Sequence, residues 1–243
     1  MASKTVLPYK DSEESKKEQV ASMFDKISSK YDLLNHVLSM GIDILWRKKA
    51  VKLLKKHSPK QILDVATGTG DFAIEAMSLN PDHIEGIDIS KGMLEVGKKK
   101  VLKLGLQDKI NLQYGDSEDM PYENESFDAI IVGFGVRNFA HLEKGLQEFY
   151  RVLKKDGVVV VLEFSKPTIF PFKQLYTFYF KYILPKVGKL ISKDNSAYTY
   201  LPESVNAFPN GDAFLEILQK LKFKNTKCKQ LTLGISSIYI GEK

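Results

Sequence analysis

The sequence predicts an α/β fold, in which one domain of 243 residues is built on a doubly wound, mostly parallel sheet of seven strands. Three observations predict it. Short apolar runs alternate with helical patterns between residues 60 and 164, a glycine-rich turn follows the first run, and two further strand patterns lie near residue 240. Such alternation is typical of βαβ units, whose helices cover both faces of a parallel sheet.

The residues ahead of the sheet predict helices. Apolar side chains recur at helical spacing between Glu18 and Lys56, and Gly41 divides this pattern in two. Residues 1–15 are polar and predict a loose segment. We therefore expect residues 1–57 to form a helical cap.

Residues 58–165 predict the cofactor-binding half, with five strands joined by helices. The last strand reads GVVVVLEF, a continuous apolar run of the kind found in strands covered on both faces. The predicted strands are Lys60–Val65, Ile84–Asp88, Lys109–Tyr114, Phe127–Gly133 and Gly157–Phe164, and the predicted helices are Asp71–Ser78, Met93–Leu104 and His141–Leu153.

The alternation stops after residue 165. Residues 166–210 predict a lid insert, with an aromatic helical pattern over Phe172–Leu190 followed by a polar loop. Residues 211–243 predict one helix, Asp212–Leu221, and two strands, Lys224–Leu231 and Ser236–Gly241. We expect these strands to be antiparallel, because a parallel return needs a crossover of about a dozen residues.

Composition excludes several classes of protein. Cys228 is the only cysteine, which rules out an intrachain disulfide framework and a cysteine metal cluster. No His, Cys or carboxylate cluster shows metal-ligand spacing, so we expect no metal site. The most apolar stretch, LYTFYFKYILP, is shorter than the about 20 residues that span a bilayer. Without a signal-peptide pattern, these features favour the cytoplasm.

The net charge of +6 suits anionic partners. Positive charge is spread along the chain, and no basic groove with interleaved aromatics is visible in the sheet portion, which argues against nucleic acid. Lysines and aromatics do share residues 166–193, where one helical stripe is formed by Phe172, Tyr176, Tyr179, Phe180, Ile183 and Val187. Core packing is one interpretation of this stripe, and peripheral contact with anionic lipid is the other. The sequence is also compatible with a homo-oligomer.

Acids and glycines follow the predicted strands at their carboxyl ends. Asp64 precedes the turn Thr67-Gly68-Thr69-Gly70, Asp88 ends the second strand, Asp116 and Ser117 follow the third, and Gly133 ends the fourth. Because the carboxyl ends of parallel strands meet at one edge, where ligands bind in such folds, we expect these residues to form a cofactor site.

Two cofactors fit this pattern. The run Gly68–Ala73 matches the G-x-G-x-x-A form of dinucleotide turns, and Asp88 lies about where a ribose-binding acid is expected. S-adenosylmethionine suits it better, because Asp71 at the helix start would repel a pyrophosphate, whereas a carboxylate-lined cleft favours a sulfonium cation. The terminal strand pair also favours a seven-stranded methyltransferase sheet. In a third interpretation, Asp64 and Asp116 only cap turns.

Five segments carry a family resemblance over nearly the whole chain. They are Tyr31–Asn35 with Leu38-Ser39 and Trp46-Arg47, Asp64–Asp71, Gly133–Asn138, Leu162–Ser165, and Tyr198–Val205 with Phe208-Pro209. Through them the sequence resembles the demethylmenaquinone/ubiquinone C-methyltransferase family of quinone biosynthesis. The glycine turn is shared by many methyltransferases, whereas the GFGxRN and YxYLPES segments are together specific.

The resemblance implies a class I methyltransferase fold, which is Rossmann-like, with S-adenosyl-L-methionine as cofactor. It implies methyl transfer to a ring carbon of a membrane-resident prenylated quinol, converting demethylmenaquinol to menaquinol, with the benzoquinol precursor of ubiquinone as the alternative. The implied cofactor contacts fall on Thr67, Asp88, Asp116 and Ser117, where the family usually has alanine at the last position. Asp64, Gly68 and Gly133 complete the predicted cofactor site.

Arg137 and Asn138 follow the fourth strand at the same edge. Methylation of a ring carbon needs an electron-rich quinol, and loss of a phenolic proton, with a pKa near 10, supplies it. We expect Arg137 to stabilise the phenolate and Asn138 to orient the quinol oxygen. The alternative for Arg137 is a structural ion pair.

Further candidates complete the predicted site. Asp71 is a third catalytic candidate, and Tyr31 and Tyr200 are expected to bind the substrate. For His36, a helix histidine without a catalytic role is the favoured interpretation.

Overall fold

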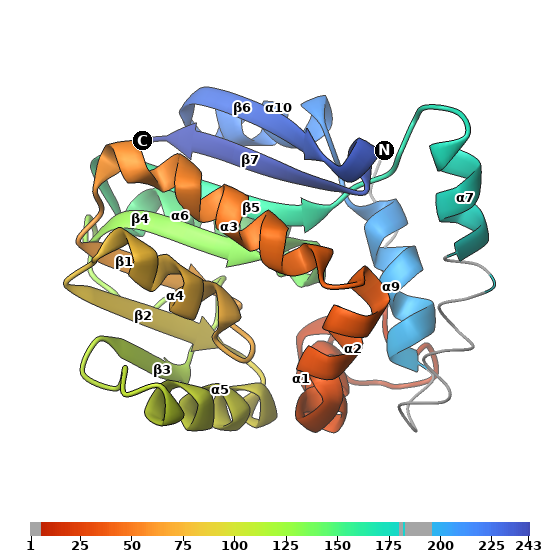
Figure 1. Cartoon of the computed structure of the whole chain (residues 1–243), viewed down its shortest axis with the longest axis horizontal. Helices are drawn as coiled ribbons and strands as arrows, with labels where there is room; N and C mark the ends of the chain where they lie inside the picture. Colours follow the sequence, from red (N-terminus) through yellow and green to blue (C-terminus); the bar gives the residue numbers. More distant parts are fainter. Residues whose placement is uncertain (1–5, 180–181, 183–195) are drawn as a thin grey trace.

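The computed structural model describes residues 6–179, 182 and 196–243. Seven strands form one sheet in the order β3-β2-β1-β4-β5-β7-β6 (Figure 1). Their bounds are Gln61–Val65 (β1), His83–Asp88 (β2), Ile110–Tyr114 (β3), Phe127–Gly133 (β4), Leu153–Phe164 (β5), Lys224–Leu231 (β6) and Ser236–Glu242 (β7). β7 runs antiparallel to both of its neighbours, and the other pairs are parallel. The predicted mostly parallel sheet is confirmed.

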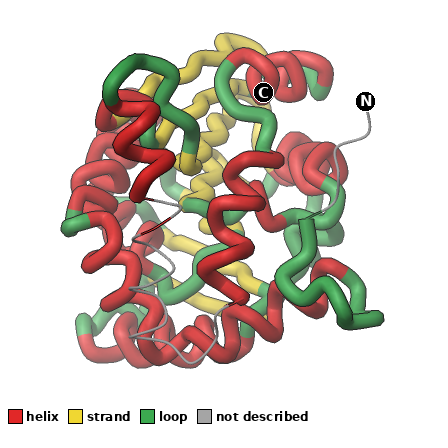
Figure 2. Tube along the Cα trace, turned by 90° about the vertical axis from the view of Figure 1, so that its right-hand side faces the viewer, coloured by secondary structure: helices red, strands yellow, loops and turns green. Residues whose placement is uncertain are grey.

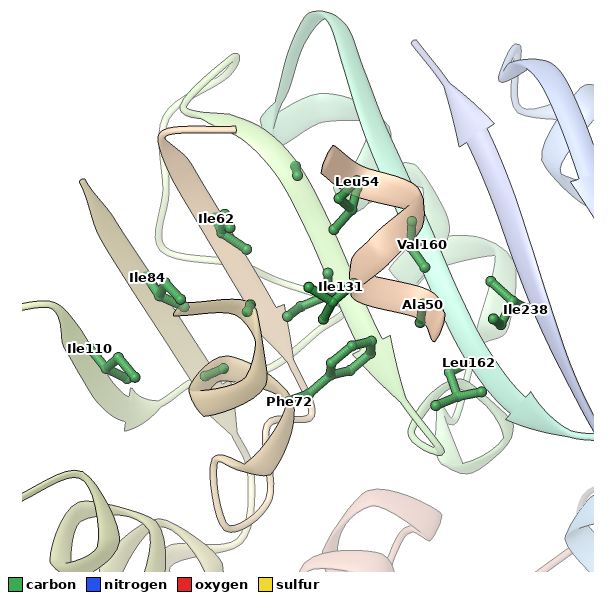
Figure 3. Close-up of a cluster of buried hydrophobic side chains, with 14 of the residues drawn as sticks. Ala50, Leu54, Ile62, Phe72, Ile84, Ile110, Ile131, Val160, Leu162 and Ile238 are labelled. Carbon is green, nitrogen blue, oxygen red and sulfur yellow. The ribbon is translucent and has the colours of Figure 1, made fainter. Parts of the chain in front are cut away.

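Helices cover both faces of the sheet. Successive side chains of a strand point to opposite faces, so Ile62 packs with one apolar cluster and Leu63 with the other. The helices of the first face, shown with its buried side chains in Figure 3, are α3 (Ile42–Leu54), α4 (Asp71–Ala76) and α5 (Lys91–Lys103). Those of the second face are α6 (Leu142–Val152) and α10 (Asp212–Lys220). This arrangement confirms the doubly wound fold.

Three further helices form a cap at one end of the sheet: α1 (Lys16–Ile27), α2 (Tyr31–Ser39) and α9 (Ser196–Ala207). In Figure 1 they lie beyond the arrowheads of the parallel strands, and Figure 2 shows helices in front of the strand ends. Val20 and Met23 of α1 pack with Tyr200 of α9 in a separate apolar cluster. The cap thus stands over the edge at which the predicted site residues collect.

Two predicted elements differ from the structure. The prediction of a polar loop around Tyr200 is wrong, because residues 196–207 form helix α9, with Pro202 inside it. The strand predicted to begin at Gly157 begins at Leu153. Of the predicted aromatic helix, α7 covers Phe172–Phe178, and the stripe positions 180, 183 and 187 lie outside the described residues.

A search of the helices in the described residues finds none with the length and hydropathy needed to cross a bilayer.

Candidate functional site

The glycine turn links β1 to α4 in a shape that needs glycine. Gly68 and Gly70 have φ values of 57° and 81°, in the left-handed region that other residues rarely adopt. Gly97 of α5 packs directly against this turn, and a Cβ there would lie 3.1 Å from the carbonyl carbon of Thr69. The turn is therefore held closely between β1 and α5.

Asp64 lies beneath the turn and is fully buried. Its Oδ2 accepts hydrogen bonds from Thr67 Oγ1 at 2.7 Å and from the Ala73 backbone N–H at 3.0 Å. Burial raises the pKa of Asp64 to about 7. Asp64 and Thr67 shape the turn but line neither of the two cavities described below, so their direct contact with a cofactor stays a prediction.

The first cavity, of about 70 Å³, lies at the carboxyl ends of the parallel strands and beneath the cap. Its lining includes five of the seven predicted cofactor residues: Gly68, Asp88, Asp116, Ser117 and Gly133. The two oxygens of Asp88 accept backbone N–H bonds from Gly68 and Ser90, each at 2.8 Å. The surrounding cap desolvates Asp88, which raises its pKa to about 6.

Lys17 of α1 also lines the first cavity, and sequence reasoning missed it because no pattern distinguishes it from the other lysines of the N-terminal helices. Its ammonium pairs with Asp116 and lies 3.6 Å from Glu118. Asp88, Asp116 and Glu118 outnumber this single lysine, so the lining is acidic. An acidic lining favours a cationic ligand.

The second cavity, of about 350 Å³, is lined mainly by apolar and aromatic side chains. Trp46, Phe134 and Phe164 form one cluster, with ring centroids 4.5 Å apart for the two phenylalanines. The Trp46 indole donates a hydrogen bond to Thr232 Oγ1 at 2.7 Å, which holds α3 to the turn between β6 and β7. The cavity is therefore built from segments far apart in the sequence.

Three aromatic residues line both cavities: Phe24, Tyr31 and Phe134. They form the wall that the two cavities share, and Phe24 meets Tyr31 edge to face at 5.9 Å. The two cavities therefore meet at these three residues, which places a ligand of one cavity beside a ligand of the other. The predicted role of Tyr31 at the substrate fits this position.

Arg137 lines the second cavity and forms the ion pair considered as its alternative role. Its Nη1 lies 3.0 Å from Oε1 of Glu163, and the two side chains are 6% and 0% exposed. Nη1 also donates to the carbonyl oxygen of Phe134. Sequence reasoning missed Glu163, although one acid within the apolar run GVVVVLEF was a signal, because a buried carboxylate needs a partner.

Three buried polar atoms around this point have no hydrogen-bond partner: Nε of Arg137, Oδ1 of Asn138 and the hydroxyl of Tyr200. Helix α9, which carries Tyr200, packs against the turn Val136–Asn138. Buried polar groups in proteins are normally paired, so these atoms are available to a polar group that enters the cavities. Burial raises the pKa of Tyr200 to about 12, so this hydroxyl stays protonated and can donate.

Asp71 lies elsewhere. It pairs with Lys100 and, at 3.4 Å, with Arg47, and it lines neither cavity. Lys100 also pairs with Asp32, and Arg47 with Asp43, so three carboxylates share two cations. The predicted repulsion of a pyrophosphate by Asp71 is thus weakened by its ion pairs and stays a prediction. Its catalytic role stays a prediction without support from this geometry. His36 likewise pairs with Asp43, at 3.1 Å, and is absent from both linings.

The first cavity fits S-adenosylmethionine in its chemistry. Asp88, at the end of β2, retains acceptor capacity for hydroxyl groups after its two backbone bonds, and the acidic lining suits the sulfonium charge. The sheet with β7 between β5 and β6 differs from the six-stranded dinucleotide sheet. Fold and site together define a class I methyltransferase.

The chain belongs to the ubiE/COQ5 methyltransferase family, whose model matches residues 12–243. A demethylmenaquinone methyltransferase of Bacteroides fragilis is 50% identical over 229 residues, which cover 94% of each chain. A ubiquinone/menaquinone biosynthesis C-methyltransferase UbiE of Geotalea daltonii is 49% identical over 230 residues, 94% of this chain and 97% of that one. The resemblance found in the sequence is confirmed.

Solved structures support the fold. A SAM-dependent methyltransferase of Thermotoga maritima has a TM-score of 0.63 at 20% identity, covering 91% of this chain and 99% of that one. A phosphoethanolamine N-methyltransferase 2 of Haemonchus contortus, in complex with S-adenosyl-L-methionine, has a TM-score of 0.58 at 16% identity, covering 80% of this chain and 52% of that one. The predicted fold class and cofactor class agree with these findings.

Proposed function

We propose that this chain methylates a ring carbon of demethylmenaquinol, with S-adenosylmethionine as the donor. Membership of the family establishes a methyltransferase, and the names of the relatives in Bacteroides fragilis and Geotalea daltonii suggest the quinone substrate. The observation that carries the proposal is that Arg137 and Tyr200, which line a large apolar cavity, each have an unpaired buried polar atom. A third such atom belongs to Asn138, which lines the adjoining first cavity. A quinol has the matching chemistry, since its apolar rings carry two hydroxyl groups.

The residues divide the work between the two cavities. S-adenosylmethionine, when bound, supplies an electrophilic methyl group on a positively charged sulfur. The first cavity would hold it through Gly68, Asp88 and the acids near Asp116. The second cavity would hold the quinol ring against Trp46 and Phe164 and keep water away from it.

Arg137 would stabilise the quinol as its phenolate. A guanidinium beside the oxygen lowers the cost of losing the phenolic proton, and the negative charge makes the ring carbon nucleophilic. Glu163 and the Phe134 carbonyl hold Nη1 of Arg137, which leaves Nε as its unpaired donor. Tyr200 would donate a second hydrogen bond, because its raised pKa keeps the hydroxyl protonated. As the ring carbon takes the methyl group, the methyl–sulfur bond would break and leave a neutral thioether. The methylated ring carbon would then lose its own proton to solvent, which restores the aromatic ring.

A labelled-methyl transfer assay tests the proposal. Reduced demethylmenaquinol, the reduced benzoquinol precursor and oxidised demethylmenaquinone are offered separately to the same enzyme. We expect label in the reduced naphthoquinol and none in the oxidised form, since only the quinol has an electron-rich ring. If only the benzoquinol became labelled, the substrate would be the ubiquinone precursor and not demethylmenaquinol. If neither quinol became labelled, the proposal would be refuted.

A second test needs no turnover. Binding of S-adenosylmethionine should raise the unfolding temperature of the free protein, whereas NAD should not. A shift with NAD alone would favour a dehydrogenase instead.

A further inference from the structure

An exposed apolar surface surrounds the opening of the second cavity. Met40, Leu175 and Leu233 all line this cavity, yet they are 82%, 60% and 54% exposed. A side chain that both lines a cavity and faces solvent lies at its mouth. The three residues come from the α2–α3 connection, from α7 and from the turn between β6 and β7, which are distant in sequence.

Neighbouring residues extend this surface outward. Ile44 and Leu45 follow Met40 at the start of α3, and Ile169, Phe170 and Phe178 flank Leu175. Among the described residues, eight of the thirteen large exposed apolar side chains belong to these three segments. Together with Tyr182 they form what we call the mouth surface. Such concentration marks an interaction site, because scattered exposed apolar residues are the norm on soluble proteins.

The charges beside the mouth surface are positive. On α3, Lys48 and Lys49 follow Ile44 and Leu45 by four residues each, so each lysine lies on the same side of the helix as an apolar residue. Residues 166–179 contain two lysines and no acid. The one acid of residues 40–56 is Asp43, which is buried and paired with Arg47.

We propose that the mouth surface docks on an anionic lipid bilayer, so that the second cavity opens toward the hydrocarbon. The inference rests on the proposed function for its substrate, because a prenylated quinol resides in the membrane and its tail must leave the cavity through this mouth. Exposed apolar side chains flanked by lysines are the pattern of a protein surface that lies on a membrane, with the apolar groups among the acyl chains and the lysines at the phosphates.

Flotation with vesicles tests the docking without any turnover. The protein is mixed at low salt with vesicles of phosphatidylcholine alone or of phosphatidylcholine and phosphatidylglycerol. We expect the protein to float with the anionic vesicles and to dissociate as salt is added, because salt screens the lysines. Equal flotation with both kinds of vesicle would show that the lysines do not contribute to docking through anionic lipid. No flotation with either kind would overturn the docking.

Two matched variants identify the surface. Leu45→Glu/Phe178→Glu changes residues of the mouth surface that are 56% and 54% exposed and do not line the cavity. Leu102→Glu/Leu104→Glu adds the same charge at residues that are 67% and 55% exposed at the end of α5. We expect the first variant to lose about tenfold in partitioning to anionic vesicles and the second to lose far less. Equal losses would overturn the assignment.

Measurements of methylation distinguish a failure of the docking from a failure of the proposed function. With a short-chain, water-soluble demethylmenaquinol, both variants should turn over at the wild-type rate, whereas the first should be slower on long-chain quinol in vesicles. A protein that floats but methylates no quinol would refute the proposed function and leave the docking standing. A protein that stays off vesicles and dimerises through Leu45 and Phe178 would show that a second copy covers this surface, and would overturn the docking.

Discussion

The two cavities are built in different ways. Most of the first cavity comes from short motifs directly after β1, β2, β3 and β4, so its polar residues are fixed by the strand ends that carry them. The second cavity collects Trp46, Phe164, Tyr200 and Thr232 from α3, β5, α9 and the turn after β6. One site depends on local sequence and the other on how distant segments pack.

Their chemistry differs in the same way. The first cavity is small and acidic, and its carboxylate Asp88 holds backbone N–H groups. The second is larger and mainly apolar, and the Arg137 side chain in its lining is paired with the buried carboxylate of Glu163. A conserved donor can be bound by the same few groups in many enzymes, whereas the acceptor requires a shape specific to each, which explains why only the first pattern is shared widely among methyltransferases.

The ion pair of the second cavity should show the largest effect. Arg137→Gln leaves the Glu163 carboxylate buried without a cation and should lower the free energy of unfolding by about 3–5 kcal/mol. Arg137→Gln/Glu163→Gln removes both charges and should recover most of this loss. Urea unfolding of the wild type and of both variants measures it. If both variants lost the same free energy of unfolding, the instability would not come from an unpaired buried charge on Glu163.

The buried acid beneath the first cavity should make stability depend on pH. The pKa of Asp64 is raised from 3.8 to about 7 in the folded protein, so the folded state binds this proton more tightly than the unfolded chain. The stabilisation is fully present below pH 4 and is lost as pH rises through 7, on the order of 4 kcal/mol. Asp64→Asn should flatten this decline in urea unfolding between pH 4.5 and 7.5. Parallel curves for the two proteins would contradict the assignment.

Asp88 tests whether the first cavity binds the donor. Asp88→Asn should weaken S-adenosylmethionine binding by about 2 kcal/mol, because an amide cannot accept from Gly68 and Ser90 and still accept from a ligand. The KM for the quinol should stay unchanged, since Asp88 does not line the second cavity. Asp82→Asn, exposed before the start of β2, is the control for calorimetry. Equal affinities in both variants would place the donor elsewhere.

Replacing Tyr200 should give the smallest change in the free energy of unfolding, but with a sign opposite to that of most core substitutions. Its hydroxyl is buried without a partner, so Tyr200→Phe should raise the free energy of unfolding by about 1 kcal/mol while lowering kcat/KM for the quinol about tenfold. The matched control is Tyr239→Phe, because the Tyr239 hydroxyl accepts a hydrogen bond from the Gly211 N–H at 2.8 Å and its loss should destabilise the protein. Destabilisation in both variants would indicate that Tyr200 is paired.

The sequence predicted what depends on neighbours along the chain. The parallel strands at the first cavity and its residues Gly68, Asp88 and Asp116 followed from turns placed directly after apolar runs. Helix α9 was missed because Pro202 and the mixed polar and aromatic residues around it suggested a loop, and its buried face becomes visible only once α1 lies against it. The ion pairs of Asp71 could not be predicted for the same reason, since its partners Lys100 and Arg47 come from other helices.

The position of β7 determines the order in which the sheet can be completed. β7 follows β6 in the chain but lies between β5 and β6, and it pairs with both. During synthesis on the ribosome, β6 therefore emerges before the strand that joins it to the rest of the sheet. Until residues 236–242 arrive, the edge of β5 stays open, and a chaperone or a misplaced strand could occupy it.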